Sequence, residues 1–318
     1  MKFACIRNSE CFINEDLQSK LSLIYLKQAL SVKKGGVITY KQKIGISIGN
    51  EYCVPMDETL QIIKNVGFDA ISPVWKSREA LFEIAHTAKK LGLEIQSLHA
   101  PFKKAADMWS SQADICGPVK DELLEAIDSC AQLQIPILVV HVWLGFDYKF
   151  EKELLYYENF DEIVSYAERN GIKIAFENTE GEEYLYALME HFENNDTVGF
   201  CWDSGHEMCY NRSVDLLAEF GDRLIMTHLN DNLGISRFDG KIFWTDDLHL
   251  LPFDGIADWN DNVLRLKKSR YMPILNFELR IQSKPNRHEN DIYMQMPLEL
   301  YFTEAYKRAC KIAYWMNQ

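Results

Sequence analysis

Side chains able to bind a metal ion or move a proton recur in this sequence directly after short apolar runs. In the segment Phe200-Cys201-Trp202-Asp203-Ser204-Gly205-His206, an apolar run ends on a carboxylate and a turn then presents an imidazole. A single polar residue at the end of a strand is ordinary, but six at regular intervals indicate that six strand ends point at one place. The other five runs end at His99, His141, Glu177, His228 and Glu278.

The chemical types of these residues predict a divalent metal site. The segment after His228 adds two candidates, Asp247 and His249. Imidazole and carboxylate groups without thiolates suit Mn²⁺, Mg²⁺, Co²⁺ or Zn²⁺ and disfavour a cysteine-rich structural zinc site. Taken alone, Asp203 could simply cap the next helix, and Glu177 could pair with a lysine. For the whole set this explanation weakens, because burying several carboxylates together without a cation costs free energy.

From Lys43 onward, strand-like runs alternate with amphipathic helical segments. Eight βα units in one domain predict a (β/α)₈ TIM barrel, in which the strand ends and the following loops build the active site. A doubly wound open sheet accounts less well for polar residues at so many strand ends. Strands are predicted near residues 44–48, 70–74, 94–98, 137–140, 172–176, 197–200, 224–227 and 274–277, and helices near 56–66, 78–91, 119–133, 154–169, 184–192, 214–220 and 298–315.

The first 42 residues precede this repeat. Leu17, Leu21 and Ile24 lie on one helical face, so a short N-terminal helical extension (1–42) is expected before the barrel domain (43–318). The extension carries no recognisable chemistry. Its helix and the long loop after His228 are candidate contacts in a homo-oligomer.

The amino-acid composition argues against some classes of binding partner. The net charge of -13 over 318 residues disfavours nucleic acid and anionic membranes, because an acidic surface repels them. The eight cysteines show no CxxC spacing, which favours reduced, buried thiols. No apolar run is long enough to span a bilayer, and charge interrupts the start of the chain too early for a signal peptide. A cytoplasmic location is therefore predicted.

These motifs together resemble the xylose isomerase-like TIM barrel superfamily, which joins sugar and sugar phosphate isomerases and epimerases with endonuclease IV. The resemblance runs from about residue 43 to the end of the chain. One departure, Pro252-Phe253-Asp254-Gly255 in place of the usual Pro-Gly-x-Gly, concerns the shape of a loop more than the ligands. The matching segments are Ser97-Leu98-His99-Ala100-Pro101, Glu177-Asn178-Thr179, Trp202-Asp203-Ser204-Gly205-His206, His228-Leu229-Asn230-Asp231, Asp247-Leu248-His249-Leu250-Leu251-Pro252-Phe253-Asp254-Gly255 and Glu278-Leu279.

The resemblance implies a ligand set. In epimerase-type members one divalent ion is held at the positions of Glu177, Asp203, His228 and Glu278, with His206 beside it as a substrate or metal-shell contact. In endonuclease IV a three-zinc cluster also uses the positions of four further residues, so the number of ions stays open. Those four are His99, His141, Asp247 and His249.

The implied activity is that of a sugar, sugar phosphate or keto-inositol isomerase or epimerase, with a small carbohydrate as its substrate. Glu177 and Glu278 would remove and return a proton through a metal-stabilised enediolate. A dehydratase of the same superfamily would begin with the same step. A phosphodiester hydrolase like endonuclease IV is the second candidate, although the acidic charge opposes DNA binding. A non-catalytic binding protein is the third, and it is disfavoured because both candidate acid–base glutamates are present.

Other residues near strand ends have two readings each. Three tryptophans are candidate walls against a sugar or ordinary barrel packing: Trp75, Trp143 and Trp202. Four cations are candidate contacts to a phosphate or carboxylate, or solvated surface charges: Lys76, Arg237, Lys241 and Arg280.

Overall fold

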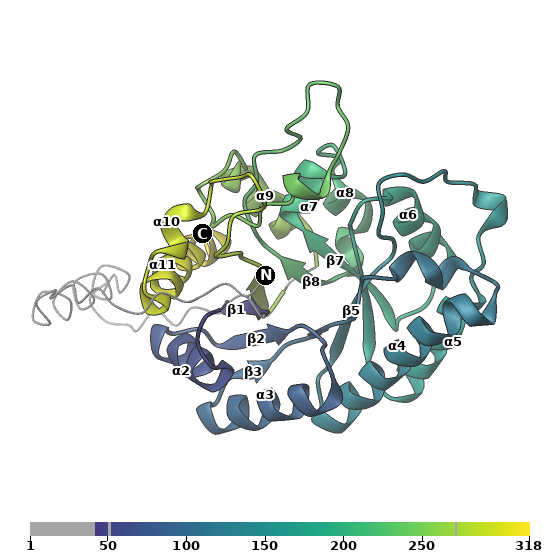
Figure 1. The fold of residues 1–318 in the computed structure, drawn as a ribbon, viewed down its shortest axis with the longest axis horizontal. Coiled ribbons are helices and arrows are strands. Elements are labelled where there is room, and N and C mark those ends of the chain that lie inside the picture. Colours follow the sequence, from purple (N-terminus) through teal and green to yellow (C-terminus); the bar gives the residue numbers. More distant parts are fainter. Residues whose placement is uncertain (1–41, 50–51, 271) are drawn as a thin grey trace, which may run out of the picture. The chain divides into compact units, whose positions relative to one another are not determined.

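Parallel strands form the centre of the described chain (Figure 1). The structure is a computed structural model and describes residues 42–49, 52–270 and 272–318. The strands are β1 (Lys43–Ile48), β2 (Ala70–Pro73), β3 (Glu94–Ile95), β4 (Leu98–His99), β5 (Ile137–His141), β6 (Lys173–Glu177), β7 (Val198–Asp203), β8 (Leu224–His228) and β9 (Ile274–Phe277).

These strands join into a closed ring. They pair in the orders β3-β2-β1-β9 and β4-β5-β6-β7-β8, and every pair is parallel. Parallel bridges from Val74 to His99 and from Leu229 to Phe277 connect the two runs at both ends. β3 and β4 thus act as one barrel strand that is interrupted at Gln96 and Ser97. The predicted (β/α)₈ barrel is confirmed, and the open doubly wound sheet is wrong.

The two-residue period of the strands decides which side chains face the inside of the barrel. Val139, Ala175, Cys201 and Met226 pack together as a small apolar layer, separate from the larger core between strands and helices. Each lies two positions before a predicted site residue. Because alternate side chains of a strand share a face, the same period turns four site residues inward at the strand ends. They are His141, Glu177, Asp203 and His228.

Helices follow the strands and pack their apolar faces outside the barrel. The expected helix over 119–133 begins earlier, at Ala113, because Pro118 is accommodated inside it. The expected helix over 154–169 begins later, after a separate 3₁₀ turn at Lys152–Leu154. A helix between the last two strands, α9, had no predicted counterpart. The helices are α2 (Met56–Val66), α3 (Arg78–Leu91), α4 (Ala113–Leu133), α5 (Glu158–Arg169), α6 (Glu182–His191), α7 (Ser204–Cys209), α8 (Leu216–Phe220), α9 (Trp259–Lys268), α10 (Asp291–Met294) and α11 (Leu298–Met316).

Three further expectations concern the chain as a whole. The expected N-terminal helix with Leu17, Leu21 and Ile24 lies outside the described residues, and the boundary at residue 42 stays a prediction. No helix in the described part of the chain has the length and apolar character needed to cross a membrane. All six described cysteines are free thiols, and four of them are buried: Cys116, Cys130, Cys201 and Cys209.

Candidate metal centre

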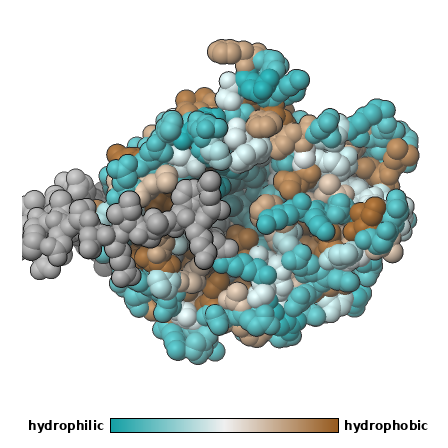
Figure 2. All heavy atoms as spheres, in the orientation of Figure 1, coloured by the Kyte–Doolittle hydropathy of each residue, from teal (hydrophilic) through white to brown (hydrophobic). Residues whose placement is uncertain are grey.

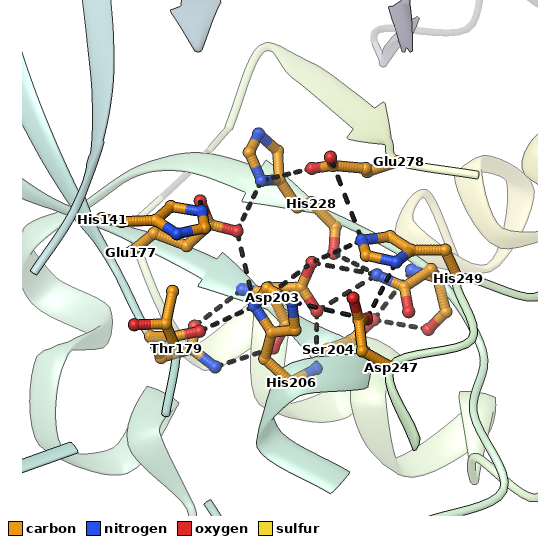
Figure 3. A network of polar contacts seen from close by, with 12 residues as sticks. His141, Glu177, Thr179, Asp203, Ser204, His206, His228, Asp247, His249 and Glu278 are labelled. Atoms are coloured by element: carbon orange, nitrogen blue, oxygen red, sulfur yellow. Dashed lines mark hydrogen bonds and ion pairs between the residues drawn. The ribbon is translucent and has the colours of Figure 1, made fainter. Parts of the chain in front are cut away.

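The carboxyl ends of four neighbouring barrel strands bring a carboxylate or an imidazole to one place (Figure 3). Glu177, Asp203 and His228 are the last residues of β6, β7 and β8, and Glu278 follows β9 directly. The parallel register pairs His141 with Glu177 and Asp203 with His228. The predicted side chains on adjacent strands therefore lie at the same height along the barrel axis.

A central group of four residues has the geometry of a shared ligand set. One nitrogen or oxygen atom from each of Glu177, Asp203, His228 and Glu278 lies within 4.8 Å of the others. Nδ1 of His228 is 2.8 Å from Oε1 of Glu177 and 2.6 Å from Oε2 of Glu278. The four residues expected to hold a single ion are therefore adjacent, while their role as ligands stays a prediction.

Two histidines flank this group on the side of Glu177. Nε2 of His99 lies 3.4 Å from Oε2 of Glu177, and Nε2 of His141 lies 3.3 Å from the same oxygen. Together the three residues form a second convergent set of metal-capable atoms. Glu177 belongs to both groups and is fully buried.

A third convergent set lies on the side of Asp203 and comprises Asp203, His206 and His249. Asp247 stands next to it, with Oδ1 at 3.4 Å from Nε2 of His206 and 2.8 Å from Nδ1 of His249. All nine residues singled out in the sequence thus occupy one continuous cluster, and Figure 3 labels all of them except His99, which lies against Glu177.

Backbone and amide groups fix the orientation of the candidate ligands. Nδ2 of Asn230 donates to both carboxylate oxygens of Asp203, at 3.1 and 3.0 Å, and the backbone N–H of His206 donates to Oδ1 at 2.7 Å. Asp203 therefore caps α7 while it faces the cluster, so the capping role is confirmed and the role as a metal ligand stays a prediction. Asn178 bonds the backbone of Asp203 on both sides. Such supporting contacts orient metal ligands in proteins.

Two histidines have their ring orientation set by a carbonyl oxygen. Nδ1 of His206 lies 2.9 Å from the carbonyl oxygen of Asn178, and Nδ1 of His99 lies 2.8 Å from that of Ala100. Because a carbonyl oxygen only accepts, Nδ1 carries a proton in each ring, and Nε2 is the nitrogen that presents a lone pair when the ring is neutral. This is the form of histidine that binds a metal ion.

The motif around Asp203 needs its glycine for reasons of space. A Cβ atom at position 205 would lie 1.9 Å from Oδ1 of Asn230, the residue whose amide holds Asp203. Any larger residue would push Asn230 away.

Burial and charge shift the ionisation of the cluster strongly. Burial alone would raise the pKa of Glu177, but His228 and His141 lower it well below its usual value. At Glu278 burial would likewise raise the pKa, but His228 and His249 lower it to about 2. Burial lowers the pKa of His228, whereas Cys201 and the two glutamates raise it well above 6.5. At Asp203 burial raises the pKa, and His206 and His249 offset only part of this rise. Without a cation, protons on imidazoles balance these carboxylates.

The unsatisfied buried atoms of the cluster fit a divalent cation. Oε2 of Glu177 and Nε2 of His228 are buried and have no hydrogen-bond partner. Oε2 of Glu278 and Oδ1 of Asp247 face only imidazole nitrogens, at 2.6 and 2.8 Å. Buried carboxylate oxygens without donors are costly, and an ion with mixed nitrogen and oxygen ligands would satisfy them. The donor set therefore matches a divalent metal.

The loop between β8 and α9 carries Asp247 and His249. The buried carboxylate of Asp231 holds the two ends of this loop by hydrogen bonds. Oδ1 of Asp231 accepts the backbone N–H groups of Asn232 and Ala257, and Oδ2 accepts the N–H of Phe253 and the indole N–H of Trp259, all at 2.8–3.0 Å. The middle of the same loop protrudes at the top of Figures 1 and 2, with Phe238 fully exposed.

The tryptophan and cation candidates lie mostly away from the cluster. Trp202 is fully buried, and its indole N–H donates to Glu207, while Trp143 stacks on Tyr184 with ring centroids 4.1 Å apart. Both therefore serve packing. Arg237 is exposed and pairs with Asp239.

Lys76 and Lys241 are likewise exposed. Lys284, which no pattern in the sequence singled out, is instead buried beside Asp247. Its place in an irregular segment after the last strand gave no periodic signal.

Comparison with known proteins agrees with this architecture. The xylose isomerase-like TIM barrel family model matches residues 60–296. An uncharacterized protein, y4fM, from Sinorhizobium fredii is 34% identical over 183 residues. That match spans 54% of this chain and 54% of the relative, so the chain covers about half the length of the relative.

Solved structures with the same fold are more distant in sequence. The IOLI protein with a bound zinc atom superposes with a TM-score of 0.69 at 18% identity, over 86% of this chain and 98% of that one. The 3-keto-D-glucoside 4-epimerase YcjR from E. coli gives 0.63 at 16% identity, over 85% and 100%. The matched family model and the barrel with its strand-end cluster agree, and the chain belongs to the xylose isomerase-like TIM barrel family.

Proposed function

We propose that this protein is a divalent-metal-dependent isomerase or epimerase of a small carbohydrate. The observation that carries the proposal is the central group, in which Glu177, Asp203, His228 and Glu278 present ligand atoms within 4.8 Å of one another. These four residues would hold the ion. The IOLI protein, which has the same fold, was solved with a bound zinc atom, and this supports a metal ion in the present barrel.

A bound divalent cation would supply a Lewis acid that makes a C–H group next to a carbonyl more acidic. The chain itself would move the proton. Glu177 and Glu278 both lie against Nδ1 of His228, and Oε2 of Glu177 is buried and accepts no hydrogen bond. One carboxylate would take the proton and the other would return it, to the opposite face for epimerisation or to the neighbouring carbon for isomerisation.

The substrate class that we favour is a keto sugar or keto-inositol. The E. coli neighbour is named for a 3-keto-glucoside, which supports a carbohydrate with a carbonyl group. A sugar phosphate has less support, because Arg237 is already paired with Asp239 on an exposed loop. A cytoplasmic location and a homo-oligomeric state stay predictions.

Deuterium incorporation tests the proposal directly. The metal-loaded protein would be incubated in deuterated water with a panel of ketoses and inososes, and uptake would be followed by mass spectrometry. We expect deuterium at one carbon next to the carbonyl of at least one compound. Loss of water from the product would identify a dehydratase instead. The Glu278→Gln variant should lose the exchange, and Glu193→Gln, which changes an exposed glutamate beyond the end of α6, should keep it.

One observation favours a second candidate, a metal-dependent phosphoester hydrolase. Glu177 and Asp203 each belong to more than one convergent group, an arrangement in which carboxylates could bridge several ions. Metal analysis would separate the candidates: three ions per chain together with hydrolysis of a phosphoester, and no deuterium exchange, would favour the hydrolase. The net charge of -13 still opposes a nucleic-acid substrate.

A further inference from the structure

Lys284 is a buried ammonium group at one end of the cluster. Its residue is 8% exposed, and Nζ lies 3.1 Å from Oδ2 of Asp247. Nζ also lies 5.6 Å from the ring centroid of Trp244, within the range of a cation–π contact. An ammonium buried this far persists only with such partners, because removing its water shell costs free energy.

The segment around Lys284 holds the ammonium in place. The backbone N–H of Arg287 donates to the carbonyl oxygen of Lys284 at 2.9 Å. The hydroxyl of Ser283 donates to Asp291 at 2.7 Å and accepts the backbone N–H of Asn290 at 3.1 Å. The turn is therefore internally bonded on both sides of the lysine.

Asp247 is engaged through both of its oxygens. Oδ2 faces Lys284, while Oδ1 lies 2.8 Å from Nδ1 of His249. The convergent set at this end contains Asp203, His206 and His249, and Asp247 is not a member of it. The carboxylate that would complete a four-ligand site thus has one of its two oxygens held against an ammonium.

We propose that Lys284 stands in for a metal ion at the Asp203–His206–Asp247–His249 end and thereby limits how many ions the centre holds. The ammonium supplies positive charge to Asp247 and repels a second cation brought close to it. Three protein ligands then remain at this end, whereas the central group keeps its four. The inference concerns the site of the proposed function, but it rests only on metal binding there and not on proton transfer.

The restriction has a chemical consequence. A centre that holds its ion at the central group leaves Nε2 of His206 and of His249 free to contact substrate hydroxyls. A centre filled at all three groups would leave few side chains unligated. Lys284 therefore favours proton transfer on a bound sugar over hydrolysis at a multinuclear site.

Metal stoichiometry tests the inference. Wild type, Lys284→Met, Lys284→Arg and Arg287→Met would be loaded with zinc, dialysed and analysed by plasma mass spectrometry and calorimetry. We expect Lys284→Met to bind about one more zinc per chain than wild type. Lys284→Arg keeps the charge and should match wild type. Arg287→Met is the matched control, because Arg287 pairs with Asp246, which is outside the convergent sets.

The position of the gained ion is tested by adding His249→Ala to Lys284→Met, which should remove it. Equal zinc content in folded Lys284→Met and wild type would overturn the inference. Three zinc ions on wild type would also overturn it, without need of any variant. Absence of deuterium exchange with the expected zinc counts would instead reject the proposed activity and leave the role of Lys284 standing.

Discussion

The two ends of the cluster are built in different ways. Glu177, Asp203 and His228 belong to strands, and the barrel register alone sets their spacing. Asp247 and His249 come from a loop, and contacts far apart in the sequence hold that loop in place. The ammonium of Lys284 forms an ion pair with Asp247, and the backbone N–H of Arg280 donates to the carbonyl oxygen of His249 at 2.9 Å.

This difference separates a fixed part of the site from an adjustable one. Strand ends in a closed ring cannot move independently, because each is bonded to both neighbours. A loop can change its length or its supports without changing the barrel. We therefore expect the strand-borne group to set whether the protein binds a metal, and the loop-borne group to set how many ions and which substrates it accepts.

The largest effect should come from Glu177, which two of the convergent groups at the strand ends share. Glu177→Gln removes a charge from the centre and leaves the imidazoles near it without their partner. Losing one member of a buried charged set costs about 3–5 kcal/mol, and a loss of this size in metal binding corresponds to an affinity lower by about 10²-fold to about 4 × 10³-fold. Calorimetric titration with zinc measures it. An affinity within a few-fold of wild type would show that the strand-borne group does not define the site.

The support of the loop should matter next. Asp231→Ala deprives four N–H groups of their acceptor, among them those of Phe253 and Trp259. Leaving several buried donors unsatisfied should lower the free energy of unfolding by about 3 kcal/mol. Denaturant unfolding measures this, with Asp222→Ala, an exposed position, as the control.

Zinc affinity at the strand-borne group should change much less in Asp231→Ala than in Glu177→Gln. Equal losses of affinity in the two variants would contradict the division of the site into two parts.

A larger side chain at position 205 tests the strand-borne group by displacing a neighbour of Asp203, without removing a charge. Gly205→Ala would press on Asn230, which orients Asp203. Overpacking of this kind costs about 1–3 kcal/mol, and a weaker zinc affinity should accompany it. Gly117→Ala in α4 is the matched control, because a Cβ there meets nothing within 4 Å. The control should gain about 0.5–1 kcal/mol from reduced backbone freedom.

The smallest expected effect is the pH dependence of metal stabilisation. The pKa values of His206 and His228 are raised well above 6.5 by nearby carboxylates. In the metal-free protein their stabilising contribution is full below 6.5 and is lost as the pH rises through their folded pKa values. Binding of an ion at the central group needs the His228 imidazole unprotonated, and a cation there disfavours a second positive charge on His206, so binding strengthens over the same range.

The gain in melting temperature on adding zinc should therefore be larger near about pH 8 than near about pH 6, by the equivalent of about 1 kcal/mol. Melting curves with zinc and with a chelator measure it. A gain that falls with rising pH would contradict the assignment of these histidines to the centre.

The sequence predicted the barrel and the membership of the cluster because both depend on short-range patterns. Apolar runs with a polar residue at the end indicate a buried strand whose last side chain faces solvent or a ligand. Helix starts were predicted less well: α4 begins before Pro118, and α5 begins four residues after the expected Leu154. Packing rather than local preference decides whether a helix tolerates a proline near its start. Packing also decides whether a 3₁₀ turn precedes a helix, as it does before α5.

What the sequence by itself determined is the set of candidate ligands at the strand ends. The two-residue period of the strands sets which face each side chain lies on, and the repeating βα order brings the strand ends to the same end of the barrel. What only the tertiary structure decided is the environment of Asp247. The turn that carries Lys284 lies 37 positions along the chain from Asp247, and no periodicity links the two. Their contact depends on how two irregular loops pack over the barrel, and such packing follows from the sum of many distant contacts rather than from any local pattern.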